Sequence, residues 1–356
     1  YNLRMHAPSF LRGAATGFAA CGLAVLMSSM PPQGNIERRL AYAEGEDHAR
    51  EACLSPREAT KAFLAASKSH RTDKIYRHAY HVVYGPWLAP YMHMPNVSLL
   101  EIGVQTGSSL LLWQRLFKNH GRIAAIGYGR TSVQRFNLRA ADSKQKATQS
   151  SSHNMSGSGV GINFGDFRLF YGDQSDASFL SAVERDLGLA QHGNGAKFDI
   201  IIDDGSHVPW HQIFTLERIF SHWLADGGIY IIEDIETSYW DNPQPLSLFG
   251  YRFHAGVGTR GSAVEKLKQV VDVINRKFVE DAKYSVLRNR IDHQVASITF
   301  SRNCVGLVKK ISEDWMPIDN THDVVPYRPA QALQKNRSAF LQYKRESQWS
   351  VEGTPR

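Results

Sequence analysis

Acidic residues that could bind a metal ion follow two apolar runs in the middle of the chain. The runs are residues 199–202 and 229–232, and they lead into Asp203-Asp204 and Glu233-Asp234. His207 lies three residues after Asp204. Carboxylate oxygens suit Mg²⁺, Mn²⁺ or Ca²⁺, and the pKa of histidine lets it accept a proton near neutrality. The pattern therefore indicates a divalent-metal site with a general base beside it.

The two apolar runs have the properties of buried β-strands. They are short, rich in β-branched residues and almost continuously hydrophobic. Residues 210–224 between them carry apolar side chains at helical spacing, and Gly227-Gly228 ends that helix. A strand–helix–strand unit predicts parallel strands. If the strands are neighbours, both acid pairs lie at one sheet edge, roughly 5 Å apart by strand spacing.

A glycine-containing turn follows an earlier apolar run. Glu101, Gly103 and Gly107 stand where a strand leads into a helix. Such a turn lets a ligand approach the backbone. The spacing differs from the G-x-G-x-x-G of dinucleotide-binding proteins. We therefore expect a nucleoside cofactor without pyrophosphate, S-adenosylmethionine rather than NAD, and an NAD-linked oxidoreductase is disfavoured.

Other candidates have a structural alternative. Asp173 and Gln174 could hydrogen-bond an adenine edge, or their segment could cap a helix through Ser175 or Asp176. His211 lies one helical turn beyond His207 and could replace it as the base. Three aromatic residues could line a sugar site or pack in the core: Trp210, Tyr239 and Trp240.

The wider pattern predicts an α/β fold. Strands alternate with helices, and residues 295–300 and 304–309 read as a terminal hairpin, so we expect a mostly parallel seven-stranded sheet with a C-terminal antiparallel hairpin. Residues 143–161 are polar and read as a flexible insertion. The expected division is a targeting segment at 1–45, a helical extension at 46–95, the main domain at 96–312 and a C-terminal extension at 313–356.

The N-terminal segment has a basic flank followed by the apolar residues 13–30. This is typical of a signal peptide or membrane anchor and predicts a secretory-pathway protein, in the Golgi or membrane-anchored; an organelle transit peptide is the alternative. The net charge is +7, but the basic residues are dispersed, so we expect no nucleic-acid partner. A homo-oligomer is left open.

Four segments together resemble the mycinamicin-type macrolide sugar O-methyltransferases: LLEIGVQTGSSLLLW, GDQSD, FDIIIDDGSH and GGIYIIEDIETSY. Upstream, Thr72-Asp73-Lys74 followed by His78 and Tyr80 is similar to the lead-in segment of that family. The match covers about residues 72–310.

The resemblance implies a Rossmann-like class I methyltransferase that uses S-adenosylmethionine and Mg²⁺ (or Mn²⁺) to methylate a hydroxyl of a sugar or glycoconjugate. It implies metal ligands at Asp204, Glu233 and Asp234 and a general base at His207. The cofactor would lie against Glu101, Gly103, Gly107, Asp173, Gln174 and Asp203.

One position departs from the pattern of this class. Gly129 stands where an acid usually binds the ribose hydroxyls. Losing a charged hydrogen bond costs about 1.5–3 kcal/mol. This favours a second hypothesis, a catalytically silent scaffold with the same fold, whereas the intact acid cluster favours an enzyme.

Overall fold

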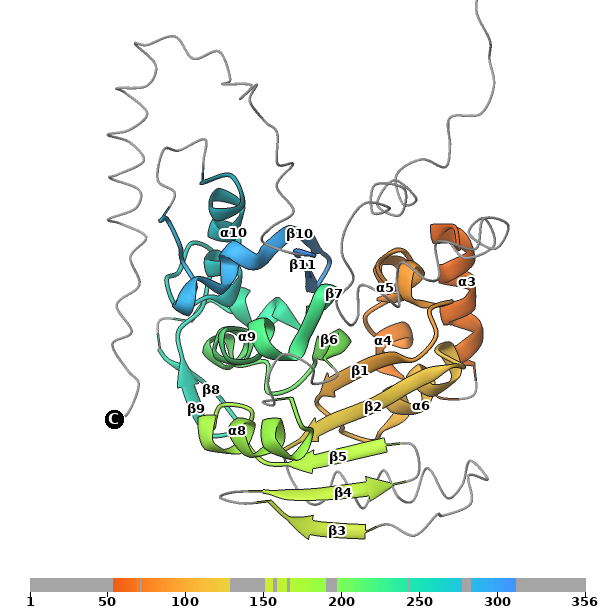
Figure 1. The fold of residues 1–356 in the computed structure, drawn as a ribbon. Coiled ribbons are helices and arrows are strands. Elements are labelled where there is room, and N and C mark those ends of the chain that lie inside the picture. Colours follow the sequence, from red (N-terminus) through yellow and green to blue (C-terminus); the bar gives the residue numbers. More distant parts are fainter. Residues whose placement is uncertain are drawn as a thin grey trace, which may run out of the picture.

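The computed structural model describes residues 54–68, 70, 72–128, 151–155, 159–164, 167–189, 197–242, 244–276 and 283–311. In these residues, strands and helices alternate around one large sheet (Figure 1). The predicted α/β class is confirmed. The expected targeting segment, Gly129 and the whole C-terminal extension lie outside the described residues.

The centre of the sheet is parallel, as the sequence predicted. Its strands lie in the order β7 (Leu224–Glu233), β6 (Phe198–Asp203), β1 (Val97–Ile102), β2 (His120–Gly127) and β5 (Phe167–Tyr171). Neighbouring strands in this group pair in parallel. All five therefore point their carboxyl ends to one edge, where open α/β sheets bind ligands.

Antiparallel hairpins extend the sheet at both edges. The predicted terminal hairpin is β10 (Val295–Ser301) with β11 (Cys304–Lys309), and β11 pairs antiparallel with β7. At the other edge, β3 (Ser151–Asn154) and β4 (Val160–Phe164) bring the described sheet to nine strands instead of seven. Much of this second hairpin falls in the expected insertion. Its polar sequence gave no strand pattern, but pairing with an edge strand requires only backbone groups.

Helices cover both faces of the sheet (Figure 1). The core on one face joins the strands to α8 (Ala177–Asp186), α9 (Pro209–Trp223) and α10 (Ala263–Ile274). The other core joins them to α3 (Pro56–Ser67), α5 (His81–Leu88) and α6 (Ser108–Leu116). Successive residues of β1 illustrate the division: Leu99 belongs to the second core and Leu100 to the first. The strands are thus buried on both faces.

The N-terminal helices pack directly on this sheet. Ser55 begins α3 and forms a capping box with Glu58. Phe63 of α3 stacks on Tyr84 of α5 at 5.4 Å, and Tyr84 lies 5.6 Å from the ring of Trp113 in α6. The short helix α4 (Asp73–Tyr76) lies between α3 and α5 in the chain. This packing holds residues 72–84 against the carboxyl edge of the sheet.

Short elements complete the described chain. They are the 3-10 helices η1 (Ala89–Tyr91), η2 (Ile235–Tyr239) and η4 (Arg288–Gln294), and the two-stranded sheet of β8 (Leu246–Leu248) and β9 (Tyr251–Phe253).

Candidate active site

A cavity of about 750 Å³ opens at the carboxyl edge of the parallel strands. Its wall includes Gly103 after β1, Tyr128 after β2, Asp173 after β5, Asp204 after β6 and Asp234 after β7. A volume of about 300–1,000 Å³ is usual for a small-molecule site. The cavity therefore lies at the same sheet edge at which the sequence predicted the two acid pairs.

The two acid pairs lie on adjacent strands, as predicted, but each pair is divided between the cavity and the interior. Asp203 is opposite Ile232 in the register of β6 and β7, which brings the two strand ends together. Asp204 and Asp234 line the cavity. Asp203 and Glu233 are at most 1% exposed and are not part of the wall. The first residue past each strand reaches the ligand space.

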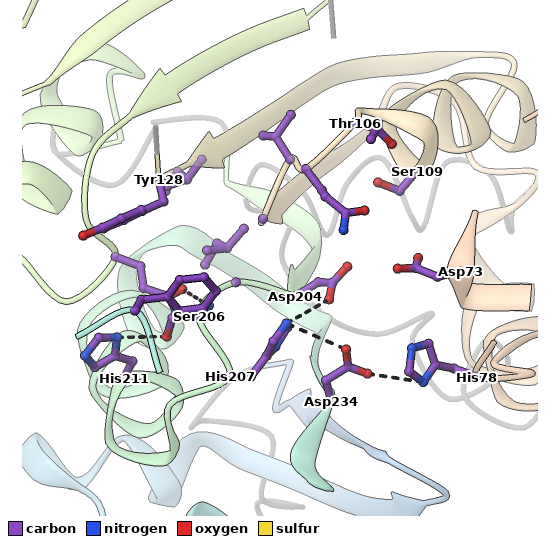
Figure 2. Close-up of a pocket in the computed structure, with 18 of the residues that line it drawn as sticks. Asp73, His78, Thr106, Ser109, Tyr128, Asp204, Ser206, His207, His211 and Asp234 are labelled. Carbon is purple, nitrogen blue, oxygen red and sulfur yellow. Dashed lines mark hydrogen bonds and ion pairs between the residues drawn. The ribbon is translucent and has the colours of Figure 1, made fainter. Parts of the chain in front are cut away.

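Asp204, His207 and Asp234 converge on one point (Figure 2). Nε2 of His207 lies 4.0 Å from Oδ1 of Asp204 and 3.7 Å from Oδ2 of Asp234. One potential ligand atom from each of the three side chains lies within 4.8 Å of the others. Carboxylates this close repel unless a cation or proton lies between them. Two carboxylates and an imidazole are a donor set that fits a divalent cation.

Two of these residues adopt an uncommon backbone conformation. His207 has φ of +57° and Asp234 has φ of +51°. Neighbours contact their backbones: Oγ1 of Thr237 donates to the carbonyl of His207 at 2.6 Å, and the amide of Asp234 donates to the hydroxyl of Tyr80 at 3.3 Å. Left-handed conformations of such residues persist where the surroundings enforce them, and they gather at functional sites.

Glu233, the third acid expected to bind metal, forms side-chain contacts with residues 72–84. Both of its carboxylate oxygens lie 2.8 Å from Nζ of Lys74, and Tyr84 donates to Oε1. Burial raises the pKa of Glu233, and the ammonium of Lys74 opposes that rise. The sequence placed Lys74 only in a lead-in segment. Its type and position gave no sign that it would reach the acids.

The two candidate histidines lie in different environments. His211 is fully buried, and Nδ1 lies 2.8 Å from Oγ of Ser206. Burial lowers the pKa of His211 to about 4, although the charge of Asp173 acts in the opposite direction. Its side chain is not part of the acid group, whereas that of His207 lies between Asp204 and Asp234 (Figure 2). The geometry favours His207 as the base.

On the β1 side of the cavity, the turn after the strand brings Gly103 against the loop that carries Asp204. Gly103 has φ of +102°, and a Cβ at this position would overlap the carbonyl oxygen of Asp204. Glu101 lies behind the wall, where Oγ of Ser109 donates to it at 2.7 Å and burial raises its pKa to about 7. Gly107 precedes α6 and also lies off the wall.

The candidates after β5 are held by protein groups. Nε2 of Gln174 donates to Asp203 at 3.1 Å, and Oε1 of Gln174 accepts from the amide of Ser206 at 2.8 Å. Gln174 therefore fixes the loop that leads to His207. Asp173 accepts from Ser175 and Tyr251. Burial alone would raise the pKa of Asp173, but these hydrogen bonds outweigh it and lower the pKa.

The structure also places the candidate helix cap and the candidate aromatic residues. Asp176 caps α8 by accepting from the amide of Ser178. Trp240 lines the cavity, Tyr239 lines an adjoining pocket of about 350 Å³, and Trp210 packs against the ring of His211. Sequence reasoning missed two exposed aromatics on the wall, whose rings lie 6.2 Å apart: Tyr128 and Phe249.

Comparisons with known proteins agree with the resemblance seen in the motifs. No family model matches the chain. It is 32% identical over 166 residues to mycinamicin VI 2''-O-methyltransferase of Micromonospora griseorubida, covering 43% of this chain and 35% of that protein. It is 29% identical over 212 residues to 8-demethyl-8-alpha-L-rhamnosyl tetracenomycin-C 2'-O-methyltransferase of Streptomyces olivaceus, covering 58% and 43%. The chain thus matches less than half the length of these two relatives.

A solved structure shares the fold. MycE methyltransferase of the mycinamycin biosynthetic pathway, in complex with Mg and SAH, superimposes with a TM-score of 0.51 at 21% sequence identity. The match covers 83% of this chain and 65% of MycE. The predicted likeness to macrolide sugar O-methyltransferases and the methyltransferase-like sheet are confirmed.

The expectation of a secretory or Golgi location is wrong. It rested on the composition of residues 1–45, whereas the relatives that the chain matches are O-methyltransferases of the bacteria Micromonospora griseorubida and Streptomyces olivaceus. Within the described ranges, no helix combines the length and apolar character needed to cross a membrane.

Proposed function

We propose that this protein transfers a methyl group from S-adenosylmethionine to a hydroxyl of a sugar or glycosylated acceptor, with the help of a divalent metal ion. The observation that carries the proposal is the position of His207, with Nε2 between Oδ1 of Asp204 and Oδ2 of Asp234 at the edge of a ligand-sized cavity. The similarity to O-methyltransferases that act on rhamnosyl and macrolide compounds supports the same reaction class.

The cofactor fits the side of the cavity next to β1. Gly103 lines the cavity, and because it has no Cβ its turn packs directly against the carbonyl of Asp204. Thr106 and Ser109 place hydroxyls on the wall there (Figure 2). We assign this part to the methionine and ribose groups, and the wall at Asp173 and Tyr128 to the adenine. Gln174 also lines the cavity, and Glu101, Gly107 and Asp203 would support this side from behind the wall.

The metal fits the opposite side, at Asp204 and Asp234. A bound divalent ion would lower the pKa of a sugar hydroxyl and hold a vicinal oxygen beside it. The MycE structure contains Mg and SAH, which is consistent with a site of this kind. We assign Asp204 and Asp234 as ligands, while Glu233 supports them through its contacts with Lys74 and Tyr84.

His207 would remove the proton of the acceptor hydroxyl. Its side chain is 25% exposed toward the cavity, so an acceptor can reach it. As the new C–O bond forms, the bond from sulfur to the methyl carbon breaks, and the hydroxyl proton passes to Nε2 of His207. The chain contributes the alignment of these groups, which can supply much of a methyl-transfer rate. The exposed ring of Trp240 could form one wall for the sugar.

Calorimetric titration tests the proposal before any acceptor is known. The full chain is titrated with S-adenosylmethionine in the presence of Mg²⁺ and, separately, with Mn²⁺ alone. We expect saturable binding in both experiments. A chain that binds no S-adenosylmethionine would be a silent scaffold, and the proposed function would be wrong.

An acceptor screen then tests the chemistry. Formation of S-adenosylhomocysteine is followed with a panel of methyl glycosides that carry adjacent hydroxyls. EDTA should abolish turnover, and Mg²⁺ or Mn²⁺ should restore it. The control is the same panel with one of the two adjacent hydroxyls removed, which should not react. Turnover that persists after full chelation would exclude the metal from the reaction.

A further inference from the structure

Lys74 is a buried cation inside the acid cluster. Its side chain is 1% exposed and comes from α4, outside the sheet. Nζ lies 2.7 Å from Oδ2 of Asp204, 2.8 Å from both oxygens of Glu233 and 3.3 Å from Oε1 of Glu101. One ammonium therefore faces carboxylates from the ends of three neighbouring strands, β1, β6 and β7.

These contacts make an oxygen cage with a cation at its centre. A buried lysine is costly unless acids compensate its charge, and here three acids do so. Glu101 in turn depends on Lys74 for compensation of its buried charge. Its Oε1 atom is buried and has no hydrogen bond in the described structure, and the ammonium of Lys74 at 3.3 Å is the charge that faces it. Without Lys74, the buried carboxylates of Glu101 and Glu233 and the partly exposed carboxylate of Asp204 would be left to repel one another.

The cage is separate from the candidate metal position on the cavity side. Asp204 is shared between the two, because Oδ2 faces Lys74 while Oδ1 faces His207. Asp234 belongs only to the cavity side, where Tyr80 and Asn303 donate to its Oδ1 atom. The acids therefore define two adjacent positions for positive charge, and the protein fills one of them itself.

We propose that Lys74 occupies a second cation position of the acid cluster, so that the protein binds one divalent ion rather than two. Lys74 is then a positioning residue: it holds Oδ2 of Asp204 inward and leaves Oδ1 free to bind metal at the cavity. The inference rests on the proposed metal-dependent function. It also makes the N-terminal helices a part of the site.

Counting bound Mn²⁺ tests the proposal directly. Free Mn²⁺ is measured by electron paramagnetic resonance during titration of the full chain. We expect one ion for the parent and two for Lys74→Met, because the vacated cage offers carboxylate oxygens to a second ion. Lys74→Arg keeps the positive charge and should bind one. The double variant Lys74→Met/Glu233→Gln removes one charge of each sign and should also return to one.

A matched control separates this effect from the general loss of a buried lysine. Lys266 is also mostly buried and lies 3.5 Å from Glu217, away from the cavity. Lys266→Met should leave the Mn²⁺ count at one. If Lys74 only anchored residues 72–84, its removal would weaken Mn²⁺ binding and would not add a second ion. A Lys74→Met variant with one ion or fewer, in the presence of a parent with one, would overturn the proposal.

Poor folding of Lys74→Met would still leave a decisive measurement. A cation that binds only the folded state raises the melting temperature, and the rise is larger when a second site is added. Lys74→Met and Lys74→Gln should therefore gain more in melting temperature from added Mn²⁺ than the parent does. A gain equal to or below that of the parent would contradict the proposal.

The same titrations distinguish this inference from the proposed function. A parent with no bound ion and a Lys74→Met variant with one would sink the metal-dependent reaction and leave the cation position standing. A parent and a variant with one ion each would keep the reaction and remove the special role of Lys74.

Discussion

The two sides of the cavity are built differently. On the acid side, the ends of β6 and β7 bring Asp204, His207 and Asp234 close together, and residues 72–84 hold the acids through polar contacts. On the cofactor side, the wall combines a backbone turn at Gly103 with polar side chains such as Thr106 and exposed aromatic rings such as Tyr128. The acid side is constrained by close charges, whereas the cofactor side is shaped by backbone, uncharged polar groups and aromatic rings together with Asp173.

This difference predicts where substitutions will affect chemistry and where they will affect stability or cofactor fit. Substitution of an acid-side residue that reaches the cavity should change kcat with little effect on the free energy of unfolding. Substitution of a residue that shapes the cofactor side, or that joins the two sides, should mainly lower the free energy of unfolding. Substitutions at His207, His211 and Gly103 test the division, with Gly188→Ala as a control.

The largest effect is expected for His207→Ala. We expect kcat to fall by about 10²–10⁴-fold, the usual contribution of a positioned general base. The affinity for S-adenosylmethionine should barely change, because His207 faces the acids and not the Gly103 turn. Steady-state kinetics with the acceptor found in the screen, together with calorimetry, measure the two quantities.

His211→Ala is the matched control for that variant. His211 is buried beside Ser206 on the cofactor side, so its loss should lower stability and leave kcat within about tenfold of the parent, below the range for a general base. An inactive His211 variant beside an active His207 variant would reverse the assignment. Full activity in both would assign proton removal to water or to the metal.

Much of the acid side was predictable because topology alone places it. The apolar runs predicted adjacent parallel strands, and the register of β6 and β7 confirms this. Parallel strands end at one edge, so the acids that follow them must come close. The contribution of Lys74 was not predictable, since it depends on how α3 and α5 pack on α6, and a helix of four residues carries no periodic signal.

The cofactor side was predicted less well for a physical reason. Motif reasoning identifies residue types but not which way a side chain faces at a strand end. Glu101 and Asp203 fell behind the wall, and the amide of Gln174 is occupied by Asp203 and Ser206. Phe249 reaches the wall from the connection between β8 and β9, a contact that no local pattern indicates.

Gly103→Ala tests the junction of the two sides. Its Cβ would overlap the carbonyl oxygen of Asp204, and φ of +102° is unfavourable for alanine. We expect a loss of about 3 kcal/mol or more in the free energy of unfolding, since strain and a backbone clash combine. Urea denaturation measures the loss.

Gly188→Ala provides a control for the backbone conformation alone. Gly188 has φ of +67°, but no atom lies within 4 Å of the position that a Cβ would take. Its substitution should cost only about 1–2 kcal/mol, which is the strain of a left-handed alanine. Equal losses in the two variants would show that the close contact between Gly103 and Asp204 is unimportant.

The smallest effect concerns the pH dependence contributed by His211. Burial lowers the pKa of His211 from 6.5 to about 4 in the folded protein, so the unfolded chain binds the proton more readily between these values. Stability from this group is therefore complete above pH 6.5 and is lost as pH falls toward 4. The loss should amount to about 2–3 kcal/mol at about pH 4. Urea unfolding of the parent and of His211→Asn across this range measures it: the difference between their pH profiles should slope in this direction. Parallel profiles would show that His211 is not buried as a neutral ring, and the contrast between the two histidines would then fail.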